Sequence, residues 1–386
     1  MVSASMVALS AFSIGLVLHG IVAQLSGKNL KRSVLRLCVV LSLLAMLCGL
    51  PLALELAPSL YAFYLPAMLP VLLLVPVALY NYVGTRMRAD RASFLGVKHA
   101  SLPILGGMVM LGFWWLPTEA RNQMLVRGDL PGGALPALLA IAAFGLVLLA
   151  ALGSAFYMFG ILRDLSRFRR TLKNHLSNTR QFELRWVEAL ALGIFALWAI
   201  VAAALISDNI GLEMIFPGEV ILIATAGIIL LLSANADTTQ PKLAAMKPSG
   251  ESAVPPLASE PGEKYLKSAL SQSDKERIAS KLTTAMSEKC LYRDPTLSLS
   301  KLSDHIHAAP NSVSQALNEH LEITFFDFVA KWRVKEARSL LANSAASVLE
   351  ISLEVGFNSR TTFYKAFKAN FDMTPSQFRK SLKLQA

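Results

Sequence analysis

The stretch "EVGFNSRTTFYKAFK", residues 354–368, decides how the last third of the chain folds. Gly356 follows one apolar helical stretch, and Ser359 opens the next. Glycine readily adopts the left-handed backbone that ends a helix, and serine is a favoured N-cap residue. Phe363 and Phe367 stand four residues apart and therefore share one helix face. The pattern predicts two short helices joined by a tight turn.

The same pattern occurs twice in the chain. Each copy has two apolar residues four apart, a short break, and two more apolar residues four apart, which is the spacing of a helix-turn-helix. We predict these motifs at residues 299–321 and 347–370, joined by a stiff helix with the sequence "FFDFVAKWRVKEARSLL". The apolar positions are Leu302, Ile306, Val313 and Leu317 in the first copy, and Ile351, Val355, Phe363 and Phe367 in the second.

The last helix of the second motif has a polar outer face. Its two phenylalanines would anchor it to the domain, so its basic and hydroxyl side chains point elsewhere. Such a face suits the major groove of DNA. A solvated face on a helical bundle would have the same composition, and the pattern alone leaves that alternative open. The side chains concerned are Arg360, Thr361, Tyr364, Lys365 and Lys368.

Residues 266–386 resemble the DNA-binding domain of AraC/XylS-type transcription regulators. The resemblance rests on "LYRDPTLSLSKLSDHI", "NSVSQALNEHL", "TFFDFVAKWRVKEARSLL", "EISLEVGFNSRTTFYKAFK" and "MTPSQFRK". The run from Ile351 to Arg379 matches the signature of that family. The resemblance implies seven helices with two helix-turn-helix motifs, each of which places one helix in a major groove.

The resemblance also implies which residues contact DNA. The base-reading positions would be Asn311, Ser312 and Gln315 in the first motif, and Arg360, Thr361, Tyr364 and Lys365 in the second. Lys368 and Arg379 would contact phosphate. The turn and its packing would depend on Gly356, Phe357, Ser359, Phe363 and Phe367.

The sequence departs from the family pattern at four positions, three of them in or next to the first motif. Ala309 stands where a capping serine or threonine usually begins the recognition helix, although Pro310 suits the first helical position. His307, Glu322 and Asp372 stand where the family usually has glycine. We therefore expect the first motif to read DNA more weakly than the second.

The first two thirds of the chain are strongly apolar. The whole protein is 54% hydrophobic and only 16% charged, below the charged fraction of about 25% in soluble proteins. Seven apolar segments are each long enough for a helix to cross a bilayer. The sequence thus predicts an all-α protein with a seven-transmembrane-helix N-terminal domain. The segments are 4–25, 36–55, 60–83, 100–117, 136–160, 187–206 and 215–234.

The loops between these segments differ in charge. The loops after the first, third and fifth segments hold fifteen Lys/Arg, and the alternate loops hold two. Basic loops stay in the cytoplasm. The N-terminus is therefore expected outside and the C-terminus in the cytoplasm, where DNA is.

We divide the chain into a membrane domain, residues 1–236, a flexible linker, 237–263, and a DNA-binding domain, 264–386. Proline and small residues without an apolar period mark the linker. Stretched out, it would reach about 90 Å from the bilayer.

These features predict a membrane-anchored, sequence-specific DNA-binding regulator that couples a signal sensed by the spans to gene expression. The segment "SNTRQFELRWVEALAL" (177–192) is similar to one in membrane-embedded AraC-type regulators, which implies a sensor. The alternatives are spans that only anchor the domain, or a domain released by proteolysis. The expected location is the inner membrane of a bacterium, as a multi-pass protein.

The sequence predicts no enzyme, cofactor or metal site, because it lacks phosphate-binding loops, metal-ligand spacings and nucleophile motifs. The expected partners are double-stranded promoter DNA and the lipid bilayer. A small-molecule or protein signal of unknown identity would act on the spans. A second copy of the chain would complete a homodimer.

The charge asymmetry of the loops makes a topology prediction. A reporter enzyme that works only outside the cytoplasm should be active when fused after Pro58 or Asn209, and inactive when fused at Lys173. Reporter activity in cells checks this outcome. Activity at Lys173 would contradict the proposed orientation.

Overall fold

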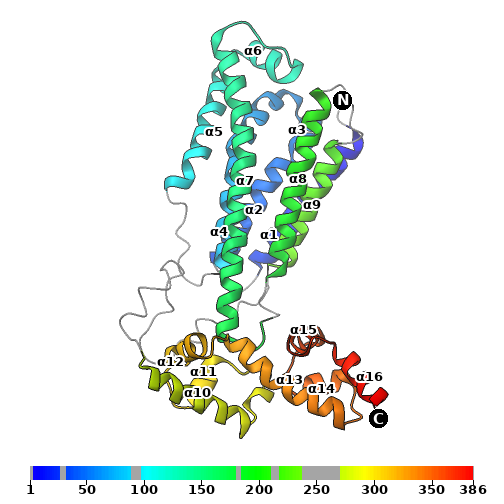
Figure 1. The fold of residues 1–386 in the computed structure, drawn as a ribbon. Coiled ribbons are helices and arrows are strands. Elements are labelled where there is room, and N and C mark those ends of the chain that lie inside the picture. Colours follow the sequence, from blue (N-terminus) through cyan, green and yellow to red (C-terminus); the bar gives the residue numbers. More distant parts are fainter. Residues whose placement is uncertain are drawn as a thin grey trace. The chain divides into compact units, whose positions relative to one another are not determined.

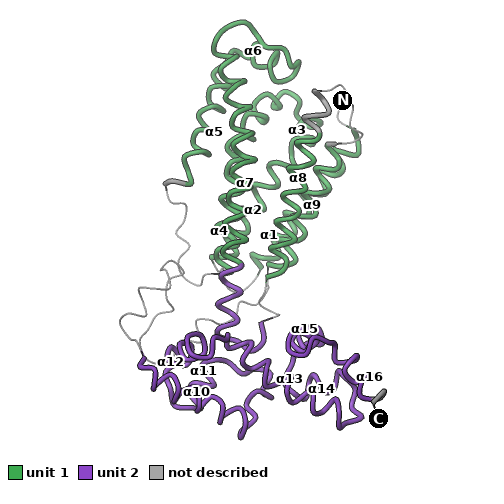
Figure 2. Tube along the Cα trace, viewed as in Figure 1, with its two compact units in different colours: residues 1–165, 184–239 green, residues 166–183, 240–386 purple. Residues whose placement is uncertain are grey.

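The chain divides into two compact units (Figures 1 and 2). The computed structural model describes residues 3–26, 32–87, 97–179, 184–209, 217–236 and 270–385. Unit 1 comprises residues 1–165 and 184–239, and unit 2 comprises 166–183 and 240–386. The predicted linker, 237–263, lies outside the described residues. Within the described ranges, all regular structure is helical, apart from an isolated β-bridge between Leu176 and Ser298.

Unit 1 is a bundle of mostly apolar helices. Helix α1 packs on α2 and α9, and α4 packs on α2 and α5. A buried cluster forms where α4, α5 and α7 meet, with Leu73, Phe113 and Leu146 among its members. The helices are α1 Ala4–Leu25, α2 Arg32–Cys48, α3 Leu50–Leu56, α4 Tyr61–Met87, α5 Val97–Trp115, α6 Thr118–Asn122, α7 Ala134–His175, α8 Arg185–Asn209 and α9 Pro217–Ala234.

The described residues contain fewer candidate membrane spans than the seven predicted from the sequence. Among the described residues, four helices are long and apolar enough to cross a membrane, or up to six if each bent pair forms one span. The pair α2 and α3 bends by 52°, and Pro51 at the start of α3 explains why α2 does not continue. The pair that begins at α5 bends by 120° after Trp115. The apolar part of α9, Gly218–Ala234, is shorter.

Unit 2 holds the region predicted to bind DNA, together with the last ten residues of α7 (Figure 2). Its two helix-turn-helix motifs are α11 with α12, and α14 with α15. The helix α13 connects them, as the sequence pattern predicts. The helices of this region are α10 Gln272–Ser287, α11 Leu299–His305, α12 Pro310–Gln315, α13 Phe325–Asn343, α14 Val348–Glu354, α15 Arg360–Phe371 and α16 Pro375–Gln385.

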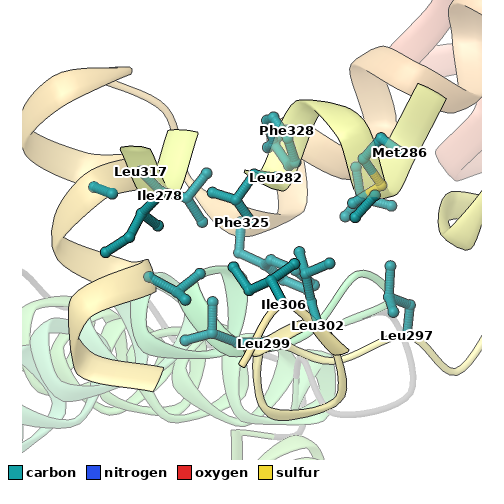
Figure 3. Packing of buried hydrophobic residues seen from close by; sticks show 14 of the residues in the cluster. Ile278, Leu282, Met286, Leu297, Leu299, Leu302, Ile306, Leu317, Phe325 and Phe328 are labelled. Carbon is teal, nitrogen blue, oxygen red and sulfur yellow. The ribbon is translucent and has the colours of Figure 1, made fainter. Parts of the chain in front are cut away.

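The connecting helix α13 supplies side chains to two separate cores. Phe325, Phe328 and Val329, at its start, belong to the core of the first motif (Figure 3). Val334 and Leu341, further along, belong to the core of the second motif, which also contains Phe357, Phe363 and Phe367. One helix is therefore the common support of both motifs.

Most helices of unit 2 begin with a hydroxyl cap, and α12 is the exception. A side-chain oxygen accepts a backbone N–H at the starts of α10, α11, α13, α14 and α15, and α14 has a full capping box. Ala309 precedes α12 and offers no such oxygen, although Pro310 occupies the first turn. A missing cap costs about 0.5–2 kcal/mol. The caps are Ser271, Ser298, Thr324, Ser347 and Ser359.

Four turns of unit 2 have a left-handed backbone at Gly356 and at the three positions where the related family usually has glycine. Gly356 has φ +95°, and His307, Glu322 and Asp372 have φ between 51° and 55°. Residues other than glycine seldom adopt a positive φ, and aspartate tolerates a positive φ better than glutamate does. The three substituted positions thus keep the turn that glycine would allow, at some cost in strain.

Gly356 also has no room for a side chain. A Cβ added there would lie 2.7 Å from the carbonyl oxygens of both Tyr292 and Arg293. Both atoms belong to the backbone and cannot turn aside. This close approach joins the turn of the second motif to the loop that precedes the first motif.

We expect Gly356→Val to destabilise unit 2 by at least about 1–3 kcal/mol, because strain at positive φ adds to this clash. Limited proteolysis and thermal unfolding of the full-length protein measure the effect. Glu354→Val places the same side chain at an exposed position two residues earlier and should change little. Equal stability of the two variants would contradict the prediction.

Candidate nucleic-acid interface

The second motif presents a polar face on a firmly anchored helix. Phe363 and Phe367 are fully buried on the inner side of α15, and their rings lie 5.7 Å apart. Arg360, Thr361, Lys365 and Lys368 are exposed. Tyr364 is half-buried and packs edge-on against Phe363. The structure thus brings the five sequence-predicted contact residues of α15 onto its outer side.

Arg360 is held at the start of this face. Its Nη2 donates a hydrogen bond to Tyr364 Oη at 3.1 Å, and its guanidinium carbon lies 5.0 Å from the centre of the Tyr364 ring. Tyr364 Oη also lies 2.9 Å from Ser376 Oγ at the start of α16. This chain of contacts restricts the Arg360 side chain while leaving it exposed. A guanidinium held in this way loses less conformational entropy when it binds a base edge or a phosphate.

Arg379 differs from the lysines of α15, because its side chain is only half-exposed. Its Nε and Nη2 are buried, and neither has a hydrogen-bond partner among the described residues. Unpaired buried donors of a guanidinium are costly, and an anion would satisfy them. This arrangement is compatible with the phosphate contact predicted from the sequence.

The first motif offers fewer free side chains. Asn311 is exposed and Ser312 is half-buried. Gln315 is only 6% exposed, and its amide nitrogen donates to Glu319 at 3.1 Å. Glu319 is also paired with Lys275 of α10 at 2.6 Å. The predicted Gln315 contact with a base would require this side chain to leave its present partner.

Sequence reasoning missed Arg333, the largest fully buried side chain of unit 2. Its Nε donates to the carbonyl of Tyr292 at 2.6 Å, and its Nη2 donates to the carbonyl of Asp294 at 2.9 Å. Its guanidinium carbon lies 5.5 Å from the centre of the Phe357 ring. Arg333 therefore ties α13 to the loop before the first motif and to the turn of the second.

Burial lowers the pKa of Arg333 to about 10, so the guanidinium keeps its proton at neutral pH. A signal for this role was present in the sequence. The other residues at four-residue spacing along α13 are all apolar and buried, so an arginine in that row must be buried with them. Those residues are Phe325, Val329, Ala337 and Leu341.

Within the described ranges, no three histidine, cysteine, aspartate or glutamate side chains gather as a metal site would require. Cys38, Cys48 and Cys290 are free.

Comparisons with known proteins match the C-terminal part of the chain. Residues 302–381 match the family model described as "Helix-turn-helix domain". The HTH-type transcriptional regulator CdhR of Pseudomonas aeruginosa is 32% identical over 106 residues, which cover 28% of this chain and 32% of CdhR. The melibiose operon regulatory protein of Escherichia coli is 28% identical over 87 residues, which cover 22% of this chain and 29% of that protein.

The matched part thus spans about a third of the length of these curated relatives. Among solved structures, the C-terminal domain of AraT, a response regulator from Geobacillus stearothermophilus, matches 30% of this chain and 88% of its own length. Its sequence identity is 23% and its TM-score is 0.24. The sequence relatives are transcription regulators, and no catalytic family is indicated. The comparisons therefore support a helix-turn-helix domain in the C-terminal part of the chain, similar to that of transcription regulators.

Proposed function

We propose that this chain is a membrane-embedded transcription regulator, which binds promoter DNA through both helix-turn-helix motifs. The observation that carries the proposal is the outer face of α15. A restrained arginine and two lysines lie on this face, and buried phenylalanines anchor the opposite face of the helix. Residues 264–386 hold eighteen Lys/Arg against twelve Asp/Glu. This excess favours contact with phosphates and makes the affinity fall as salt rises.

The membrane part of the proposal is seven spans, with the N-terminus outside and unit 2 in the cytoplasm. Helix α7 supports the membrane location through a long row of exposed apolar side chains, which a soluble bundle would bury. A lipid surround removes this cost, since these side chains then face hydrocarbon instead of water. The row contains Ile141 (71% exposed), Phe144 (62%), Leu152 (67%), Phe156 (71%) and Phe159 (67%).

An apolar cavity favours spans that sense over spans that only anchor. It has a volume of about 270 Å³ and is lined from α2, α4, α7, α8 and α9, all within unit 1. That exceeds the ~150 Å³ of an engineered cavity that binds benzene. Two of its hydroxyls already donate within their own helices, Ser154 to Ala150 and Thr225 to Ile221. The cavity therefore suits an apolar molecule, and we propose that its occupant is the signal.

The DNA-binding proposal is tested with Arg360→Ala in the full-length protein. If Arg360 reads a base, the change should cost about 1–3 kcal/mol of affinity at one base position and relax specificity there. Binding to promoter variants, in detergent and over a range of salt, measures this. Glu354→Ala, which removes an exposed side chain from the preceding helix, is the control. An equal loss on all sequences would reduce Arg360 to a phosphate contact, and no binding by the unaltered protein would refute the proposal.

The sensing proposal is tested by filling the cavity. Val147 lines it, whereas Ile141, on the same helix, is exposed. Val147→Phe should remove the dependence of a target-promoter reporter on growth conditions, because the larger ring occupies the space of the signal. Ile141→Phe should leave that dependence intact. Replacing residues 1–165 and 184–235 with unrelated spans of the same topology, with residues 166–183 kept, completes the test. An anchor would keep its response after this replacement, and a soluble fragment that appears with the signal would indicate proteolytic release.

A further inference from the structure

The chain that follows the fifth apolar segment belongs to unit 2. Residues 166–175 are the end of helix α7, and residues 166–183 belong to the same compact unit as the two helix-turn-helix motifs. We call residues 172–179 the strap. Its Leu172, Ser177 and Thr179 are at most 4% exposed. A loop between two spans would be expected to meet water, so burial at these positions requires an explanation.

Ser177 is the best-connected residue of the strap. Its backbone N–H donates to the carbonyl of Leu297 at 3.3 Å, and its hydroxyl donates to the same carbonyl at 2.6 Å. The neighbouring residue, Leu176, forms an antiparallel β-bridge with Ser298. Ser298 is the N-cap of α11, the first helix of the first motif. The strap thus pairs with the backbone just where the first motif begins.

The strap also completes the surroundings of Arg333. The guanidinium Nη1 donates to the carbonyl of Ser177, and Nη2 donates to its hydroxyl, each at 3.4 Å. Its other two acceptors are the carbonyls of Tyr292 and Asp294. A charged group that is 1% exposed needs its acceptors, because each lost hydrogen bond leaves a desolvated donor. Removing the strap would therefore destabilise Arg333 in its present position.

Arg333 stands at the joint of the two motifs, which we define as residues 292–298, Arg333, Gly356 and Phe357. The carbonyls of Tyr292 and Arg293 contact Gly356, and Arg333 lies over the ring of Phe357. Arg293 also forms an ion pair with Glu336 of α13. A second contact of the strap with α13 comes from Lys173, whose Nζ lies 5.7 Å from the centre of the Phe326 ring.

We propose that the strap is a built-in docking element, and that its binding to the joint holds the two motifs in the arrangement that binds DNA. The strap is continuous with the membrane unit through α7, so a movement of that helix could release it. Release leaves Arg333 with two backbone acceptors and loosens both motifs relative to each other. DNA binding must then order the two motifs again, and the free-energy cost of this ordering lowers the affinity for DNA. This effect on DNA rests on the proposed function, whereas the docking itself does not.

Docking is tested by disulfide trapping in the full-length protein in membranes. Directly paired residues in an antiparallel bridge have Cα atoms about 4.5–5.5 Å apart, within the range of a disulfide. The pair is Leu176→Cys with Ser298→Cys, in a chain whose three native cysteines are replaced. A protease site inserted within 237–263 separates the two cysteines along the chain. After oxidation and cleavage, the fragments should stay joined until a reductant is added.

The matched control combines Leu176→Cys with Asn343→Cys, which is exposed at the other end of α13. Its fragments should separate after cleavage. If the paired cysteines join the fragments no more than this control does, the strap does not dock and the proposal is wrong.

The effect on DNA is tested with Ser177→Pro, which removes both the N–H and the hydroxyl that bind Leu297. We expect the affinity for promoter DNA to fall about tenfold, and Asn178→Ala to leave it unchanged. Combining Ser177→Pro with the disulfide between Leu176→Cys and Ser298→Cys should restore the affinity. A reductant, which breaks the disulfide, should lower the affinity again. Such rescue excludes a protein that has merely misfolded.

The possible results separate the two claims. Trapping together with unaltered affinity in Ser177→Pro would contradict the role of the strap in DNA binding. Tighter binding by Ser177→Pro would show that the strap inhibits, which also overturns the proposal. A protein that traps the strap but binds no DNA in any form would refute the proposed function while leaving the docking intact.

Discussion

The buried guanidinium of Arg333 is the interaction on which the arrangement of unit 2 depends. It holds the carbonyls of Tyr292 and Asp294, which belong to the loop before the first motif, and it lies over the ring of Phe357 in the turn of the second. A charge in this position is stable only while its acceptors remain in place, because water cannot replace them. One side chain of the connecting helix therefore contacts both motifs and contributes to holding them in place relative to each other.

The same helix explains how unit 2 combines rigidity with an open surface. Helix α13 contributes to the separate cores of both motifs, so each motif packs its apolar residues against this shared helix. The phenylalanines of α15 then use only one side of that helix. Its opposite side remains available for basic and hydroxyl groups. In unit 1 the relation is reversed, since α7 exposes large apolar side chains such as Phe156 and Phe159, which fit a lipid environment.

Much of unit 2 could be predicted from local patterns. The apolar residues four apart located the two motifs, and the position of Gly356 indicated a turn, where the structure has φ +95°. Patterns of this kind work because a helix buries one face at a fixed period. The predicted seven spans correspond to fewer long helices among the described residues, in part because proline and glycine bend a helix while the segment stays apolar. Pro51, after Gly49, is the example.

The sequence by itself determined the helical elements, the two repeated motifs, the polar face of α15 and the apolar character of the first two thirds. It did so because each of these properties depends on residues close together in the chain. Only the tertiary structure decided that Gln315 is paired with Glu319, that Arg333 is buried, and that Ser177 contacts Leu297 and Arg333. The last contact joins residues 156 positions apart. No local period encodes such a pairing, since its partners meet only when the whole unit has folded.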